Sequence, residues 1–361
     1  MRVPLELIRP YHFFTYPAEL YETMLDDIAQ ARKYVFLETF RMTADSLGIR
    51  FRDLLAKKAE EGVEVKLLVD YWGVRALHER FFDKIRNSGG EVRFFEKIKF
   101  NTDFLTQSHR RNHRKLLLID DEVSYIGSSN ITGYNLEWRE SVLRMEDDVT
   151  TAFRKVFLED FENYRKYVLN IVSVTKKIVH GPFEILRDVP NIAVKKINYR
   201  IVKMINEAKK RVTIETPYFL PGFLIRKAMI NAVKRGVEVQ VIMPSQSDVN
   251  VVDVLRNKYL GPLYRSGIHF LLYKKGNLHA KLLLIDNETF AIGSPNFDYR
   301  SYRYMFEIML VGHDHSIIDQ IRHHVLETIE HSEPFNYKKW LERPYINRLF
   351  EWLILPFRHY L

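Results

Sequence analysis

The sequence has no cysteine among its 361 residues. This absence excludes disulfides, thiolate nucleophiles and metal sites that need sulfur ligands. Long apolar stretches are missing as well, because no run approaches the roughly 20 apolar residues that a membrane-spanning helix needs. Near the start of the chain, Glu6 and Arg9 stand where a secretory signal would be apolar. We therefore expect neither a signal peptide nor a membrane-spanning segment.

Acidic residues are outnumbered by basic ones, 46 to 55, which gives a formal net charge of +9 with histidine neutral. A surplus of this sign favours a polyanionic partner, either nucleic acid or acidic membrane lipid. The remaining composition, with 46% hydrophobic and 13% aromatic residues, is typical of a compact globular protein.

An internal repeat organises the sequence. The segment KYVFLETF at residues 33–40 returns as KRVTIETP at 210–217, an offset of 177 positions. At the histidines described below the offset is 166, so the first copy carries an insertion of about ten residues before His113. We predict two copies of one unit and a tail, with the boundaries 1–170, 171–335 and 336–361.

Each copy alternates helices and strands. In the first copy, apolar spacing predicts helices over 19–32, 49–61 and 149–166, and strands over 34–37, 63–69, 113–119, 123–127 and 140–146. The second copy ends in the same way, with a strand over 307–312 and a helix that carries Ile317, Ile321, Val325 and Ile329. This order predicts an α/β fold of two tandem α/β sandwich domains with mixed β-sheets.

One composite motif appears in both copies. It reads HxK(x)4D, followed by GSxN that begins fourteen residues after the histidine. A single copy would be weak evidence, but two copies with identical spacing are strong. The motif residues are His113, Lys115, Asp120, Ser128 and Asn130 in the first copy, and His279, Lys281, Asp286, Ser294 and Asn296 in the second.

The spacing of histidine and lysine predicts phosphodiester chemistry. In a strand, residues i and i+2 point to the same face, so each imidazole is expected beside an ammonium group. If the copies pack about an approximate two-fold axis, both pairs meet in one shared active site. A neutral imidazole can attack phosphorus, a protonated one can give its proton to the leaving alkoxide, and the lysines can neutralise the phosphoryl oxygens. We therefore expect His113, Lys115, His279 and Lys281 to be catalytic, with no metal and no other cofactor.

The other motif residues have supporting roles in this hypothesis. Glu140 follows His113 by 27 residues and Glu307 follows His279 by 28, and we expect these two carboxylates to orient the imidazoles. We expect four polar side chains to bind substrate: Ser128, Asn130, Ser294 and Asn296. Asp120 and Asp286 end strands in turns, where capping of backbone amides is at least as strong an interpretation as catalysis.

These paired motifs resemble those of the phospholipase D superfamily, and the resemblance covers nearly the whole chain. It implies a pseudo-two-fold architecture and a phosphohistidine intermediate, with His113 as nucleophile and His279 as proton donor. The segments NHRK at 112–115, WRES at 138–141, ETPYF at 215–219 and NFDYRS at 296–301 resemble bacterial cardiolipin synthases more narrowly. That resemblance implies transfer of a phosphatidyl group between two phosphatidylglycerol molecules, with release of glycerol.

Two segments favour an acidic lipid surface over nucleic acid. The tail holds seven aromatic residues in 26 positions, and a helix predicted from Pro344 places Ile346, Leu349, Phe350 and Leu353 on one face. The insertion before His113 interleaves two kinds of residue: Phe94, Phe95, Phe100 and Phe104 with Arg93, Lys97, Lys99, Arg110 and Arg111. The alternatives are a tail helix that packs on the protein and a solvated loop with buried phenylalanines.

We thus expect a peripheral enzyme on the cytoplasmic side of the cell membrane, with anionic phosphatidylglycerol as partner and no obligatory protein partner. A phospholipase D-type hydrolase or another transphosphatidylase would share every one of these features. A nuclease or other nucleic-acid phosphodiesterase would use the same histidine–lysine pairs and would suit the basic surface equally. The acceptor alcohol and the oligomeric state stay open.

Overall fold

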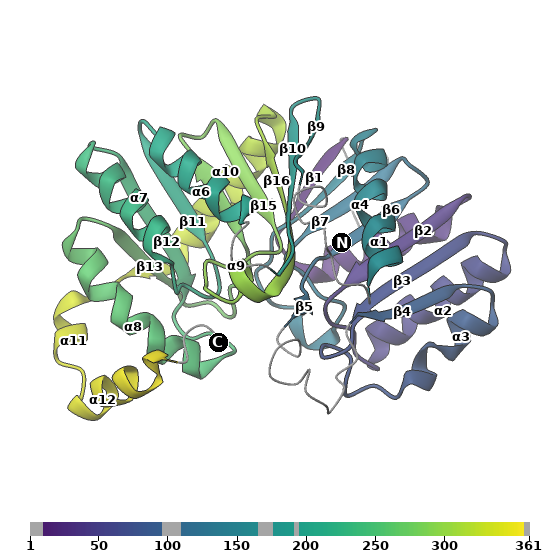
Figure 1. Ribbon diagram of the computed structural model, residues 1–361, viewed down its shortest axis with the longest axis horizontal. Coiled ribbons are helices and arrows are strands. Elements are labelled where there is room, and N and C mark those ends of the chain that lie inside the picture. The colour runs from purple at the N-terminus through teal and green to yellow at the C-terminus, as the bar shows by residue number, and fades with distance from the viewer. Residues whose placement is uncertain (1–9, 96–109, 165–175, 191–194, 357–361) are drawn as a thin grey trace.

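The computed structural model describes residues 10–95, 110–164, 176–190 and 195–356. Two β-sheets lie next to each other, one from each copy of the repeat, and helices cover their faces (Figure 1). Both sheets combine parallel and antiparallel strands, which confirms the predicted α/β fold with mixed sheets.

The first half contains a seven-stranded sheet. Its elements are β1 (Tyr11–Phe14), α1 (Pro17–Gln30), β2 (Tyr34–Thr39), α2 (Ser46–Glu60), β3 (Glu64–Asp70), the 3-10 helix η2 (Glu79–Phe82), α3 (Asp83–Asn87), β4 (Glu91–Phe95), β5 (Arg111–Asn112), β6 (Leu116–Ile119), β7 (Val123–Gly127), the 3-10 helix η4 (Gly133–Asn135), β8 (Val142–Glu146) and α4 (Val149–Asn163). The strand order is β1-β8-β7-β6-β2-β3-β4.

The second half repeats this order as β10-β16-β15-β14-β11-β12-β13, with β9 and β17 added at the two ends. Its elements are β9 (Ile178–His180), β10 (Phe183–Asp188), α6 (Lys196–Glu207), β11 (Arg211–Glu215), α7 (Phe223–Lys234), β12 (Glu238–Pro244), α8 (Asn250–Arg265), β13 (His269–Tyr273), β14 (Leu282–Ile285), β15 (Thr289–Gly293), α9 (Ser301–Tyr304), β16 (Met305–Gly312), α10 (His315–Glu330) and β17 (Ser332–Pro334).

The two motif strands begin later than the sequence predicted. β6 starts at Leu116 and β14 at Leu282, so each motif histidine and lysine precedes its strand and lies at the edge of the sheet. The strand prediction for residues 113–115 was therefore wrong. These residues leave the strand because His113 pairs instead with the other half, as described below.

Two turn aspartates connect the motif strands to their neighbours. Asp120 follows β6 with a positive φ of 55°, and its carboxylate accepts backbone N–H bonds from residues 32, 33 and 34 at the start of β2. Asp286 does the same for residues 209, 210 and 211 at the start of β11. Asp tolerates this left-handed conformation better than most residues. Both carboxylates thus cap backbone amides.

Apolar side chains gather into three clusters in the described chain. One lies between the first sheet and α1 to α3, and another lies between the second sheet and α6 to α8. The third contains side chains of both sheets together with α4 and α10, including Phe153, Phe157, Ile317 and Ile321. Because this central cluster draws on both halves, the two repeats share a hydrophobic core.

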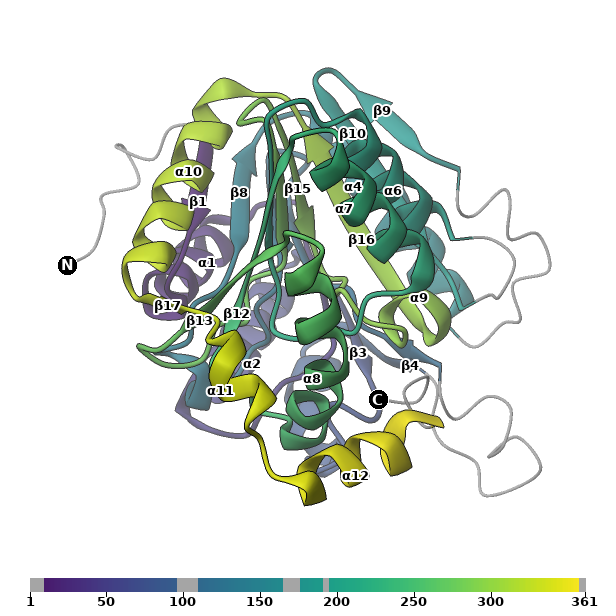
Figure 2. The ribbon, with the colours of Figure 1, turned by 90° about the vertical axis from the view of Figure 1, so that its left-hand side faces the viewer.

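The tail forms two short helices beside α8. They are α11 (Tyr337–Leu341) and α12 (Tyr345–Ile354), and Figure 2 shows them in yellow next to α8. Trp340 in α11 donates from Nε1 to the Asn257 carbonyl at 3.1 Å. Among the helices in the described ranges, none is both long and apolar enough to cross a bilayer.

Candidate active site

Short β-pairings between the halves carry each motif histidine to the opposite half. β5 pairs with the start of β16, and the His113 amide donates to the Phe306 carbonyl at 3.0 Å. In the equivalent pairing, the His279 amide donates to the Arg139 carbonyl at 2.7 Å. Phe306 directly precedes Glu307, and Arg139 directly precedes Glu140. Each histidine therefore lies next to the glutamate of the other half.

The imidazoles and glutamates form two crossed pairs. His113 Nδ1 lies 3.0 Å from Glu307 Oε1, and His279 Nδ1 lies 2.9 Å from Glu140 Oε2. Both glutamates are almost completely buried. The carboxylates are thus where an orienting role needs them, and neither carboxylate occupies the Nε2 atom of its imidazole. The spacings of 27 and 28 residues did not reveal that the pairs exchange halves.

The serines of the two motifs bind the glutamates. Ser128 Oγ donates to Glu140, and Ser294 Oγ donates to Glu307. Both serines are fully buried, and the substrate-binding role expected of them stays a prediction. They lie behind the glutamates because β7 and β15 end beside β8 and β16.

Asn130 and Asn296 are buried as well, and neither Oδ1 atom has a hydrogen-bond partner in the described chain. The binding of substrate by these two amides stays a prediction.

Both motif lysines lie beside their histidines. Lys115 Nζ donates to the His113 carbonyl at 2.5 Å, and Lys281 Nζ lies 3.0 Å from His279 Nε2. Burial, together with the charge of Lys281, lowers the pKa of Lys115 to about 7. Burial lowers the pKa of Lys281 to about 8. An anion placed between the two would raise both values again, because an opposite charge favours the ammonium form.

The two histidines differ in the charges that surround them. Burial and then the charges of Lys115 and Lys281 lower the pKa of His113 well below its ordinary value. Burial also lowers the pKa of His279, but the carboxylate of Glu140 acts in the opposite direction.

Their glutamates differ in the same sense. Burial raises the pKa of Glu307 to about 7. Burial would also raise the pKa of Glu140, but His279 and Lys281 outweigh it and lower the value. The neutral forms are therefore favoured in the His113 pair, whereas in the His279 pair the ionised Glu140 partly offsets the effect of burial on the imidazole.

A family model described as "Cardiolipin synthase, PLD-like domain" matches residues 24–164 and 201–328, which together make up most of the chain. The chain belongs to this family. The phospholipase D-like domain thus occurs twice, and the resemblance to a phospholipase D-superfamily phosphatidyltransferase is confirmed at the family level.

Named relatives agree with this membership. The major cardiolipin synthase ClsA of Bacillus subtilis is 30% identical over 337 residues, covering 90% of this chain and 70% of the relative. Cardiolipin synthase 1 of Staphylococcus epidermidis is 33% identical over 346 residues, covering 92% and 70%. The phosphatidylserine synthase of Haemophilus influenzae has a similar fold, with a TM-score of 0.77, 14% identity, and coverage of 100% of this chain and 97% of that one.

Three residues near the histidines of this family member were not predicted as site residues. The Phe40 ring lies 5.3 Å from the His113 ring, and the Trp138 ring lies 5.5 Å from that of His279. Arg300 is one of the charges that lower the pKa of His113, after burial and the nearer cations. Trp138 and Arg300 stand within the segments WRES and NFDYRS, so the sequence contained a signal for both.

The insertion before His113 is only partly described. Phe94 and Phe95 lie in β4 and are buried in the core, so they do not belong to an exposed loop as predicted. Residues Phe100, Phe104, Lys97 and Lys99 lie outside the described residues, as do Glu6 and Arg9.

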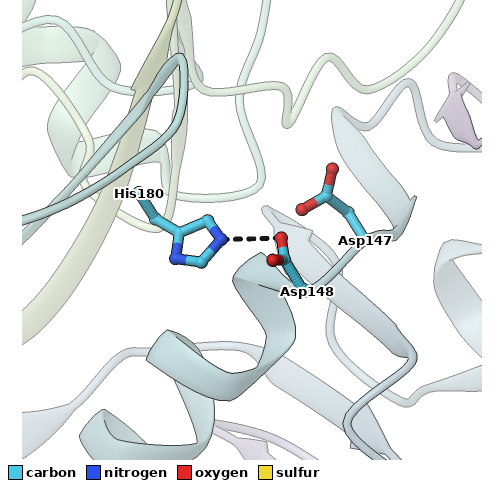
Figure 3. Close-up of side chains that lie close together, drawn as sticks. All are labelled: Asp147, Asp148 and His180. Carbon is cyan, nitrogen blue, oxygen red and sulfur yellow. Dashed lines mark hydrogen bonds and ion pairs between the residues drawn. The ribbon is translucent and has the colours of Figure 1, made fainter.

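Away from the histidines, Asp147, Asp148 and His180 form a cluster whose ligand atoms lie within 4.8 Å of one another (Figure 3). Hydrogen bonds among these residues and to their neighbours explain why they lie close together. His180 Nε2 lies 2.7 Å from Asp148 Oδ1, and Asp147 accepts hydrogen bonds from the Tyr11 hydroxyl and the Val149 amide. Asp147 and Asp148 follow the end of β8, whereas Glu140 precedes its start, so the cluster is remote from the paired histidines.

Proposed function

We propose that this chain transfers a phosphatidyl group from one phosphatidylglycerol to another through a phosphohistidine intermediate, and that it releases glycerol. The observation that carries the proposal is the crossed pair of imidazoles, each held at Nδ1 by a buried glutamate and each beside a lysine. Membership of the cardiolipin synthase family supports this choice of substrate.

In the first step, His113 Nε2 bonds to the phosphorus of the donor lipid, and the bond from phosphorus to the glycerol oxygen breaks. His279 gives its Nε2 proton to that oxygen, so glycerol leaves as a neutral alcohol. The charges around the two imidazoles support this order of roles. His113 is held neutral and can attack, whereas Glu140 favours the protonated form of His279.

In the second step, a hydroxyl of the acceptor phosphatidylglycerol gives its proton to His279 Nε2. Its oxygen bonds to phosphorus, and the bond from phosphorus to His113 Nε2 breaks. Both imidazoles thereby return to their starting states. Lys115 and Lys281 would neutralise the phosphoryl oxygens throughout, since these buried ammonium groups gain a counter-ion when the phosphate binds.

We also propose that α12 binds the surface of an anionic membrane. The helix contacts α8, and its Ile354 packs against the second-half apolar cluster. Glu351 is 2% exposed and pairs with Arg343 at 2.8 Å. Other apolar residues of the helix point outward, with Tyr345 79%, Trp352 64% and Phe350 52% exposed. An outward apolar face with aromatic residues suits a lipid interface, and the basic surplus suits the anionic cytoplasmic leaflet.

The product identifies the reaction. The protein is incubated with phosphatidylglycerol vesicles and, separately, with single-stranded DNA. We expect cardiolipin and glycerol in equal amounts, with acid-labile lipid phosphate trapped on the peptide that contains His113. Phosphatidic acid without cardiolipin would indicate a hydrolase, and cut strands without lipid turnover would indicate a nuclease. Either result would overturn the proposal.

A further inference from the structure

A row of side chains leads away from His279 and has no part in the two steps above. The Trp138 ring lies against His279, and the Tyr134 ring centroid lies 5.4 Å from that of Trp138. The guanidinium of Arg41 lies over Tyr134, 5.2 Å from its centroid. Tyr134 is 49% exposed and Arg41 is exposed, so the row runs from the proposed proton donor to the protein surface.

A second pair of polar side chains comes from the other half. The Tyr218 hydroxyl donates to Asp248 Oδ1 at 2.6 Å. Asp248 is exposed and close enough to affect two members of the row. Burial lowers the pKa of His279, but the charge of Asp248, like that of Glu140, raises it. The same charge contributes to the raised pKa of Tyr134, for which burial is the main cause.

One residue of each set is held through its backbone carbonyl. The Arg41 carbonyl accepts from the Ile131 amide at 3.0 Å, and the Tyr218 carbonyl accepts from the Thr216 hydroxyl at 2.9 Å. Met42 forms a β-bridge with Ile131, and Phe219 forms the matching bridge with Phe297. Arg41 and Tyr218 thus occupy equivalent positions in the two repeats, each tied to the loop after its GSxN motif. The repeats place different chemistry there, a cation in one and a hydroxyl in the other.

The chemistry of the acceptor explains what such a surface can bind. The acceptor must approach phosphorus where glycerol has left, which is beside His279. Its headgroup carries free hydroxyls and a second phosphate that does not react. In the described chain Arg41 has no carboxylate partner, and a guanidinium matches the geometry of phosphate. Asp248 has one oxygen held by Tyr218 and the other available to accept from hydroxyls.

We propose that Arg41, Tyr134, Asp248 and Tyr218 form the headgroup site for the acceptor phosphatidylglycerol. Arg41 binds the phosphate that does not react, and Asp248, positioned by Tyr218, accepts hydrogen bonds from the glycerol hydroxyls. This inference rests on the proposed transfer reaction and assigns the acceptor that reaction requires.

The test compares two acceptors that compete for the same phosphoenzyme. Free glycerol carries the hydroxyls but no phosphate, so its incorporation into phosphatidylglycerol reports the hydroxyl contacts alone. With labelled glycerol present, we expect Arg41→Gln to lower the ratio of cardiolipin formed to glycerol incorporated about tenfold or more. Asp248→Asn should lower both products and leave this ratio within about threefold, because both acceptors use the hydroxyl contacts. Using a ratio cancels any change in the donor step.

The matched control is Arg75→Gln. Arg75 is also an exposed guanidinium stacked on an aromatic ring, 3.9 Å from the centroid of Trp72, but it is not part of the row beside His279. The ratio should stay at the wild-type value in this variant. If Arg41→Gln lowers cardiolipin and glycerol incorporation equally, Arg41 does not recognise the acceptor phosphate and the inference is wrong. If the wild-type protein forms neither product, the proposed function itself fails, which is a different result.

Discussion

At the scale of single residues, the active site is symmetric in its atoms and asymmetric in its charges. Both histidines have a glutamate at Nδ1 and a lysine nearby. Burial raises the pKa of Glu307 to about 7. The charges of His279 and Lys281 instead lower the pKa of Glu140, which favours its ionised form. The two copies of the repeat can therefore have different roles in one reaction.

The loss of activity on replacing a histidine should depend on the leaving group, and differently for the two histidines. A lipid alkoxide needs a proton from His279, but nitrophenolate leaves without one. We expect His279→Ala to slow the first turnover of phosphatidylglycerol at least about 1000-fold and that of a nitrophenyl phosphodiester only about tenfold, by rapid-quench measurement. His113→Ala should be nearly inactive with both substrates. Equal losses for His279→Ala with the two substrates would contradict its role as proton donor.

The Glu140 carboxylate also predicts a shift in pH dependence. It raises the pKa of His279, so Glu140→Gln should lower that pKa. His279 must be protonated to donate, and the alkaline limb of the kcat/KM profile should therefore move to lower pH. Glu307→Gln serves as the control, because Glu307 contacts His113 and should leave the position of this limb unchanged. An alkaline limb that stays in place in Glu140→Gln would count against the assignment.

The sequence indicated the residues that meet in the structure, but not which glutamate contacts which histidine. His113, Lys115, Glu140 and their counterparts follow from fixed spacings within one copy. The exchange of glutamates depends instead on β5 pairing with β16 across the two halves, and nothing in a local spacing reports a pairing between distant segments.

At the scale of secondary-structure elements, Asp120 connects the turn after β6 to the start of β2. Replacement by Ala leaves three backbone N–H donors without their acceptor. We expect Asp120→Ala to lower the free energy of unfolding by about 2–3 kcal/mol, measured by urea denaturation, and to leave kcat of the folded protein within about twofold. The matched variant Asp286→Ala should be destabilised less, since Asp286 is more exposed. A large loss of kcat at unchanged stability would indicate a catalytic role.

Helix α12 presents apolar side chains to solvent while it buries a glutamate. If it binds membrane, replacing exposed apolar residues should affect vesicles and not folding. We expect Phe350→Gln combined with Leu353→Gln to weaken binding to phosphatidylglycerol vesicles at least about tenfold in a flotation assay, with little change in melting temperature. Leu326→Gln on α10 is the control, because this leucine is 56% exposed and lies outside the tail. Unchanged vesicle binding would leave α12 with only a packing role.

The order of elements was predictable because apolar periodicity is local. The helices over 19–32 and 149–166 were predicted within about three residues of α1 and α4. The starts of β6 and β14 were not, because residues 113–115 and 279–281 bond across the two halves. Contacts with the other half thus determine where each motif strand begins.

At the scale of the whole molecule, both crossed histidine–glutamate pairs come from one chain. The crossed glutamates and the central apolar cluster both combine the two repeats, so neither half holds a complete pair by itself. The acceptor surface likewise takes Arg41 from one half and Asp248 from the other. The duplicated unit thus provides a two-fold arrangement of histidines. The charges that surround the two histidines differ between its halves.

A mixing experiment follows from this arrangement. Each active site needs His113 and His279 from the same chain, and exchanging halves between chains would expose the central cluster, including Phe157 and Ile321. We therefore expect that mixing His113→Ala with His279→Ala restores less than about 1% of wild-type transfer, even after long incubation at high protein concentration. A heterodimer assembled by exchange would contain one intact site and would recover up to about half the activity. Recovery on that scale would show that the catalytic unit is a swapped dimer rather than the single chain.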